Sequence, residues 1–259
     1  HPLGFPILGT EKQLETFNRE TVQEYMKKRY TPDNIVISVA GNVDESFIDI
    51  IEQRFGSFEG EIHEETSLTP VFIGESQFID KDTEQAHFCL GFRGLSIDDQ
   101  SIYSLIILNN ILGGSMSSRL FQDVREKQGL AYSVYSYHLS YLDQGLLTIY
   151  AGTGNDQLQR LKQTIDFTID ELVTKGVTDK ELYNSKEQLK GNLILSLEST
   201  NSRMSRNGRN ELLLKRHRTL DEMIHEIDSV TQTSIRQVID DIFKEKPATA
   251  LIASKEKVK

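Results

Sequence analysis

The chain has few of the features that mark a membrane protein or a disulfide-stabilised one. Cys89 is its single cysteine, so no disulfide can form within the chain, which suits a reducing compartment. No apolar run is long enough to span a bilayer, which excludes a transmembrane helix. Positive charge is scarce, since 29 Lys and Arg face 39 Asp and Glu, for a net charge of −10. We therefore do not expect nucleic acid as a main partner.

The N-terminal stretch, "HPLGFPILGTE", has neither an initiator Met nor the pattern of a signal peptide. It reads like the interior of a protein, so we expect the chain to be part of a longer molecule. Hydrophobic content of 37% and charged content of 26% are typical of a soluble globular protein. We expect a cytoplasmic location, although a targeting segment could lie upstream of His1.

Two segments share one pattern, in which a capped amphipathic helix passes into a strand-like run. Residues 17–41 have Asn18 as the candidate N-cap and a β-type run over 35–40. Residues 230–254 have Thr231 as the candidate N-cap and a β-type run over 248–253. Asn18 and Thr231, like the apolar positions that follow each, differ by a constant 213 in number. This predicts an internal repeat whose first copy is incomplete.

The rest of the chain alternates between helical and strand-like patterns. We expect an acidic, irregular stretch over 57–82, within which 65–82 is the interdomain linker. Helices are predicted over 44–56, 98–114, 117–129, 155–175 and 178–198, and strands over 85–94, 131–138 and 144–152. This order predicts an α+β fold, with an antiparallel or mixed sheet covered by helices.

Familiar catalytic motifs are absent. The six histidines include neither HExxH nor HxxEH, so we expect no catalytic metal bound by this chain alone. Cys89 and His87 share one face of a predicted strand, but a buried small hydrophobic residue is the favoured interpretation of the thiol. "LGGSMSSR", residues 112–119, lacks the spacing of a phosphate-binding loop and is interpreted as one helix end followed by the next helix start.

The segment 199–218 is basic in an otherwise acidic chain. The spacing of Arg203, Arg206 and Arg209 places three guanidinium groups along one side of a helix. The simpler interpretation is a solvated helix face. The alternative is a positive wall for ligands that carry carboxylates.

Arg125 and Tyr132 lie seven residues apart across a glycine that separates a predicted helix from a predicted strand. Both side chains can therefore emerge at one edge of the sheet. An arginine is a permanent donor, and a phenol can donate to a carbonyl oxygen that gains negative charge. The pair could grip a peptide, or it could be a packed tyrosine beside a surface arginine. Tyr135 and Tyr137, at odd steps from Tyr132, are predicted to pack on the other sheet face.

Three blocks together resemble the M16 family of zinc peptidases, the relatives of pitrilysin and mitochondrial processing peptidase, in its compact bacterial branch. They are "SSRLFQDVREKQGLAYSVYSYH", "YTPDNIVISVAGNVD" and "HPLGFPILGTE". The resemblance covers essentially the whole chain. It implies two homologous α+β domains of the LuxS/MPP-like metallohydrolase type, the first one incomplete. Residues 1–64 would end the first domain, and 83–259 would form the second.

The resemblance also implies a function for the longer protein. Family members bind zinc through HxxEH and a downstream Glu, all upstream of the segment that matches this chain, so we expect this chain alone to be inactive. Arg125 and Tyr132 match the pair that holds the substrate and the developing oxyanion. Arg203, Arg206 and Arg209 would line a closed chamber that admits unfolded or presequence-like peptides. Active compact members pair as homodimers or with related subunits.

Two other functions stay open on the sequence. The first is a non-catalytic partner subunit that captures peptides and supports assembly, which would lack HxxEH in its full-length form. The second is a peptide-binding or structural domain that takes part in no enzyme. Both are compatible with the retention of Arg125 and Tyr132.

Overall fold

A computed structural model describes residues 1–60 and 68–257 of the chain. These divide into two compact units. Unit 1 comprises His1–Pro70 and Leu193–Thr219, and unit 2 comprises Val71–Asn192 and Leu220–Lys259. The segment 193–219 thus belongs to the same unit as the N-terminal residues. The predicted boundary at residue 64 lies outside the described residues, and the predicted division into homologous domains stays a prediction.

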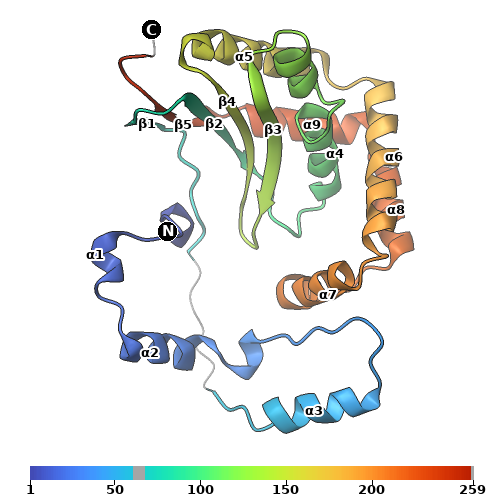
Figure 1. The fold of residues 1–259 in the computed structure, drawn as a ribbon. Coiled ribbons are helices and arrows are strands. Elements are labelled where there is room, and N and C mark those ends of the chain that lie inside the picture. Colours follow the sequence, from blue (N-terminus) through green and yellow to red (C-terminus); the bar gives the residue numbers. More distant parts are fainter. Residues whose placement is uncertain (61–67, 258–259) are drawn as a thin grey trace. The chain divides into compact units, whose positions relative to one another are not determined.

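Unit 2 is built on a mixed five-stranded sheet with the order β1-β5-β2-β4-β3 (Figure 1). Its strands are β1 (Ser76–Asp80), β2 (Gln85–Gly94), β3 (Ala131–Ser140), β4 (Gly145–Gly154) and β5 (Ala248–Ala253). Strands β1 and β5 run parallel, and the remaining neighbours are antiparallel. The predicted α+β class, with a mixed sheet flanked by helices, is confirmed.

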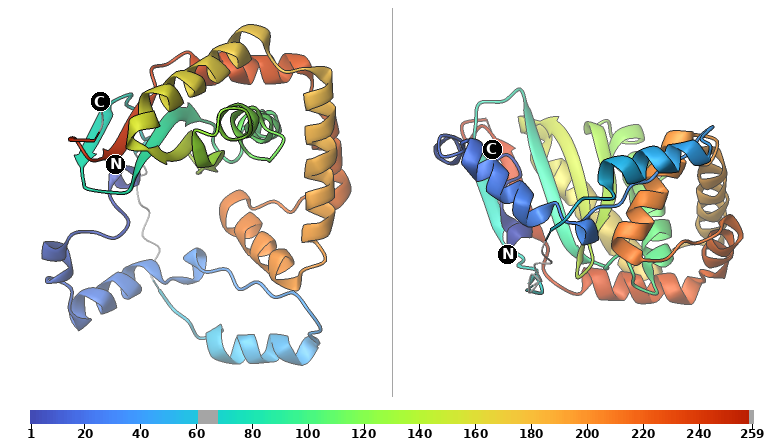
Figure 2. Two further views of the ribbon diagram at one scale, coloured as in Figure 1. Left: turned by 45° about the horizontal axis from the view of Figure 1, so that its top comes forward. Right: turned by 90° about the horizontal axis from the view of Figure 1, so that it is seen from below.

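Helices of unit 2 cover one face of this sheet, and Figure 1 shows α4 and α9 behind the strands. The helices are α4 (Ile102–Leu112), α5 (Leu158–Lys175), α6 (Asp179–Ser196), α8 (Leu220–Ser229) and α9 (Gln232–Phe243), with the short helices η3 (Phe121–Glu126) and η4 (Asn155–Gln157). The last residues of α6 belong to unit 1. Helix α4 lies beside β3, as Figure 2 also shows.

The hydrophobic core lies between the sheet and these helices. Along β2 buried residues alternate with more exposed ones, and Phe88, Leu90 and Phe92 point toward the core. Leu147 and Ile149 of β4 are completely buried on the same face. Because successive side chains of a strand point to opposite faces, the alternate residues of β2, among them Cys89, lie on the other face, where no helix of unit 2 packs closely enough to bury them fully; we call it the open face.

Unit 1 contains helices but no strand among its described residues. They are η1 (Pro2–Gly4), α1 (Glu11–Leu14), α2 (Arg19–Arg29), η2 (Pro32–Asn34), α3 (Glu45–Phe55) and α7 (Thr200–Leu214). Side-chain caps begin two of them: Asn18, the predicted N-cap, begins α2, and Asp44, the first residue of the helix predicted over 44–56, begins α3. Thr31 alone is buried among the described residues of this unit, so its apolar side chains form no core of their own.

Three expectations differ from the structure. The stretch 57–82, predicted to be irregular and to contain the linker 65–82, includes strand β1 (Ser76–Asp80), because this segment finds a parallel partner in β5. The predicted β-type run over 35–40 is not a strand, because a strand requires a hydrogen-bonded neighbour and the described residues supply none. Its counterpart over 248–253 has neighbours on both sides and forms β5. The helix predicted over 117–129 is shorter, and its main part is the π-helix η3.

Candidate functional site

The junction between η3 and β3 is set by its glycine. Gly129 has a φ of +60°, a left-handed conformation that glycine adopts without strain. Its amide donates to the carbonyl of Arg125 at 3.1 Å, which closes the end of the helix. The chain then reverses and enters β3 at Ala131. This turn brings the two sides of the junction together, as the sequence predicts.

Arg125 and Tyr132 are in direct contact. The guanidinium carbon lies 4.4 Å from the centre of the Tyr132 ring, and Nη1 donates to the Tyr132 carbonyl oxygen at 3.1 Å. A second ring, that of Phe121, lies 4.8 Å from the same guanidinium carbon. Such distances are those of cation–π interactions. Tyr132 itself is 76% exposed, so its hydroxyl is available to a ligand.

A β-bulge explains why Tyr132 stands apart from the rest of β3. Ala131 pairs with Thr153 and Ser133 pairs with Gly152, so Tyr132 is an extra residue without a partner opposite it. The bulge changes the alternation of the strand. Tyr135 and Tyr137 therefore lie on the open face of the sheet, 45% and 38% exposed. They were predicted to pack on a sheet face, and their rings contact each other there at 6.0 Å, although neither side chain is buried.

The open face of the sheet carries an aromatic cluster that sequence reasoning missed. Nδ1 of His87 lies 2.8 Å from the Tyr150 hydroxyl oxygen, within hydrogen-bonding distance, and their rings stack at 6.1 Å. The Tyr135 ring lies 5.1 Å from that of Tyr150. Burial raises the pKa of Tyr150, and the nearby Tyr135 and Cys89 raise it further. Its phenol therefore stays protonated at neutral pH. The pairing register between strands brings these residues together, and no local sequence pattern reveals that register.

Cys89 is half-buried on the same face, and burial raises the pKa of its thiol. A raised pKa lowers the fraction of thiolate, which is the nucleophilic form. His87, the possible imidazole partner, is engaged with Tyr150 instead. The geometry therefore agrees with the interpretation of Cys89 as a small packed residue.

The glycines of "LGGSMSSR" end helix α4 as predicted. The amides of Gly113 and Gly114 both donate to the carbonyl of Asn109, at 3.0 and 2.8 Å. Gly113 also packs tightly on β3, because an added Cβ would lie 2.5 Å from the backbone nitrogen of Ser136. These backbone groups are occupied by the fold and do not form a phosphate cradle.

The three arginines expected on one helix side lie on α7, in unit 1. Arg203 and Arg209 are exposed, and Arg206 is partly buried. Nε of Arg203 donates to the carbonyl of Leu197, which closes the turn before the helix. Their predicted role as a chamber wall concerns an arrangement of the units that the structure does not determine, and it stays a prediction.

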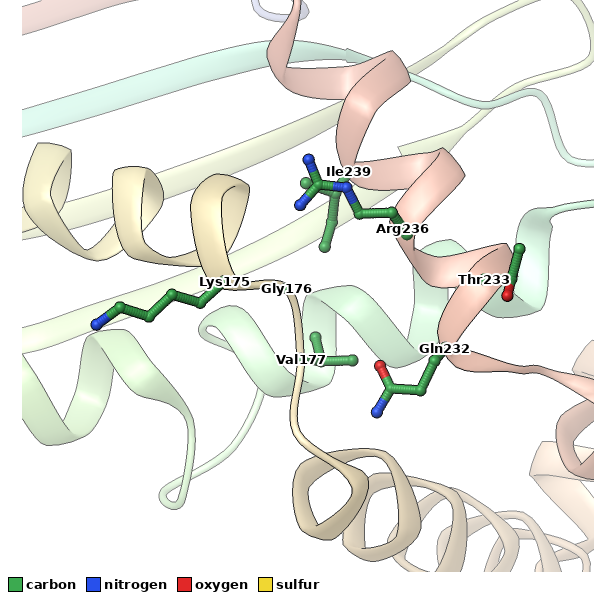
Figure 3. A pocket seen from close by; sticks show the side chains of 7 residues that line it. All are labelled: Lys175, Gly176, Val177, Gln232, Thr233, Arg236 and Ile239. Carbon is green, nitrogen blue, oxygen red and sulfur yellow. The ribbon is translucent and has the colours of Figure 1, made fainter.

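A shallow pocket of about 310 Å³ lies between the end of α5 and the start of α9 (Figure 3). Lys175, Arg236 and Gln232 supply its polar lining. Their polar groups already have partners: Nη2 of Arg236 lies 2.8 Å from Asp240, and Lys175 pairs with Glu171 on the same helix. The amide of Gln232 donates to Asp179 at 3.1 Å. This pocket therefore offers a ligand few free groups.

Neither a metal site nor a membrane helix is found in the described ranges 1–60 and 68–257. No three His, Cys, Asp or Glu side chains gather there closely enough to hold a metal ion. No helix in these ranges has the length and apolar character needed to cross a bilayer. The described residues therefore do not fit a zinc ion.

Comparison with known proteins places these features in a family. Residues 16–189 match the family described as "Peptidase M16 inactive domain". The chain is 57% identical over 253 residues to "Uncharacterized zinc protease YmxG" of Bacillus subtilis (strain 168), covering 98% of this chain and 62% of that protein. It is 35% identical to "Uncharacterized zinc protease SCO5738" of Streptomyces coelicolor, covering 96% of this chain and 56% of that protein.

Solved structures share the fold. The M16 inactive domain from Pseudomonas fluorescens superposes with a TM-score of 0.90 at 21% identity, covering 98% of this chain and 62% of that one. A protease from Helicobacter pylori gives a TM-score of 0.85 at 20% identity, covering 97% and 63%. The chain thus spans less than two thirds of the length of these relatives.

Proposed function

The chain belongs to the M16 peptidase family, and we propose that it is the substrate-binding portion of a zinc-dependent endopeptidase. The longer protein would hydrolyse unfolded peptides or presequence-like segments within a closed chamber, in the cytoplasm. Arg125 and Tyr132 would hold the substrate. The names of two relatives as zinc proteases support the reaction class.

The contact between Arg125 and Tyr132 is the observation that carries this proposal. The exposed Tyr132 hydroxyl can donate to a peptide carbonyl oxygen as negative charge develops on it. The guanidinium beside it adds a fixed positive charge and further N–H donors for a neighbouring carbonyl. Both groups are held by one turn, so little entropy is lost when they bind a peptide.

The zinc ion belongs, on this proposal, to another part of the longer protein. The described residues provide no metal site, and the relatives are substantially longer than this chain. The exposed apolar side chains of unit 1, among them Phe17, Tyr25 and Phe47, support such an arrangement. We propose that this additional part covers them, because the exposure of so many large apolar side chains is otherwise unfavourable in water.

Substitution in the full-length protein tests the proposal. Tyr132→Phe and Arg125→Ala should each lower kcat/KM for an unfolded fluorogenic peptide by on the order of 10²–10³, because each removes an interaction with the developing oxyanion. Tyr183→Phe and Arg160→Ala are matched controls, since both residues lie exposed on helices α6 and α5. Zinc content, measured by elemental analysis, should stay the same in all four variants. Unchanged turnover in both site variants would reject the proposed roles.

A non-catalytic partner subunit is the second candidate. The family description "inactive domain" favours it. A partner would contribute Arg125 and Tyr132 to the site of a homodimer or of a related subunit. Mixing the full-length protein with an active relative separates the two candidates. Activity of the protein alone supports the endopeptidase, and activity only in the mixture supports the partner.

A further inference from the structure

We propose that Phe121 is a positioning residue for the peptide-binding arginine. Its ring, together with that of Tyr132, would hold the Arg125 guanidinium in the orientation that a peptide carbonyl requires. The inference rests on the proposed function, and it adds a residue that neither the motif spacing nor the family resemblance indicates.

The contacts of Arg125 show what orients it. Its guanidinium carbon lies over two rings, 4.8 Å from the centre of Phe121 and 4.4 Å from that of Tyr132. The carboxylate of Glu126 lies 3.8 Å from Nε and is half exposed, which makes a weak ion pair. Aromatic contacts therefore hold this cation more than an anionic partner does.

Contact with aromatic rings leaves Arg125 able to bind a peptide. A ring attracts a guanidinium through its face and takes up none of its N–H donors. Among the described residues, the Tyr132 carbonyl oxygen accepts the hydrogen bond of Nη1 at 3.1 Å. A carboxylate in a bidentate pair would occupy two donors and neutralise the charge. The two rings fix the orientation and preserve the charge.

The partial burial of Phe121 distinguishes a positioning role from a role in core packing. Its neighbour Leu120 and the later Val124 are completely buried and form the core contact of the helix. Phe121 is only partly buried, and it lies four residues before Arg125, so the two side chains share a helix face. The helix is of the π type, with the Lys127 amide donating to the Gln122 carbonyl at 2.9 Å. Turns of this type are frequent at functional sites.

The first experiment measures turnover of an unfolded fluorogenic peptide by the full-length protein. Phe121→Leu keeps an apolar side chain but removes the ring, and it should lower kcat/KM by about 2- to 5-fold, the factor that corresponds to a cation–π contact. Phe121→Tyr keeps the ring and should restore kcat/KM. In the Arg125→Ala background, Phe121→Leu should have no further effect. Phe167→Leu, an exposed phenylalanine on α5, is the control.

The second experiment does not depend on activity. In the ¹H–¹⁵N spectrum of this chain, the Arg125 Nε–Hε signal should carry a ring-current shift, identified by its loss in Arg125→Lys. Phe121→Leu should move that signal, and Phe121→Tyr should not. An unmoved signal together with unchanged kcat/KM in Phe121→Leu would overturn the positioning role, even if Arg125→Ala is inactive. A moved signal with no effect of Arg125→Ala on turnover would instead reject the proposed function, and the positioning role with it.

Discussion

Replacement of Glu181 by glutamine should destabilise unit 2 measurably, although Glu181 lies outside the proposed peptide-binding pair. Its carboxylate forms a two-point ion pair with Arg119, with Nε–Oε1 at 2.7 Å and Nη2–Oε2 at 2.9 Å. Arg119 also donates to the carbonyl of Gly176 at 2.7 Å. Oε2 of Glu181 accepts from the amide and hydroxyl of Thr178, at 2.7 and 2.8 Å, at the start of α6. The pair thus joins the segment before η3 to α6.

The magnitude follows from the burial of the pair. The side chains of Arg119 and Glu181 are 17% and 29% exposed. Removal of one partner from a fully buried ion pair costs about 3–5 kcal/mol, and partial exposure reduces this to about 2 kcal/mol. Glutamine retains the size of the side chain and its capacity to accept from Thr178, so the loss reports mainly the ion pair. A loss of about 2 kcal/mol corresponds to a fall in Tm of roughly 4–8 °C.

The stability that Glu181 contributes depends on pH with a definite sign. Burial alone would raise the pKa of the Glu181 carboxyl, but the hydrogen bonds from Arg119 and Thr178 outweigh it and lower the pKa below its ordinary value of 4.5. A depressed pKa in the folded state contributes stability that is present above the ordinary value. That contribution is lost as the pH falls from about 4.5 through the folded-state pKa. The difference between the parent chain and Glu181→Gln should therefore be full at pH 7 and shrink below pH 4.5.

Urea denaturation followed by far-UV circular dichroism measures this effect, since the chain has no tryptophan to report by fluorescence. Glu171→Gln is the matched control, because Glu171 pairs with Lys175 on the exposed side of α5. An exposed pair one helical turn apart contributes at most about 0.5 kcal/mol. Equal losses for Glu181→Gln and Glu171→Gln, or a difference from the parent chain that stays constant as the pH falls below 4.5, would refute the reasoning.

Two further substitution pairs test the packing, with Tm as the readout. Gly113→Ala should destabilise by about 2 kcal/mol, because its Cβ would approach the Ser136 nitrogen to 2.5 Å. Gly191→Ala, where a Cβ meets nothing within 4 Å, should stabilise α6 by up to about 1 kcal/mol. Leu147→Ala should cost about 3 kcal/mol because this side chain is fully buried. Ile48→Ala in unit 1, at 63% exposure, should cost under about 0.5 kcal/mol, and a comparable loss would show that unit 1 has a core.

The helix boundaries that the sequence predicted best are those set by hydrogen bonds within one helical turn. Asn18, Asp44 and Thr231 begin α2, α3 and α9 through side-chain hydrogen bonds to their own first turns. Gly113 ends α4 as its position indicates. Interactions of this kind involve residues within four positions of each other, so a reader of the sequence has all the information that decides them.

The site was predicted in part. The contact between Arg125 and Tyr132 follows from a spacing of seven positions that includes one glycine, and the structure brings the two side chains together. The ring of Phe121 against the same guanidinium was not predicted, because a spacing of four positions puts two residues on one helix face without deciding whether their side chains touch.

The sequence by itself determined the α+β class and the turn that joins Arg125 to Tyr132, because caps, glycines and alternation act over short distances. Only the tertiary structure decided that 248–253 forms a strand and 35–40 does not, since strands depend on neighbours remote in sequence. It also decided, through the bulge at Tyr132, that Tyr135 faces Tyr150 on the open sheet. Pairing register is a property of two strands, and no single segment contains it.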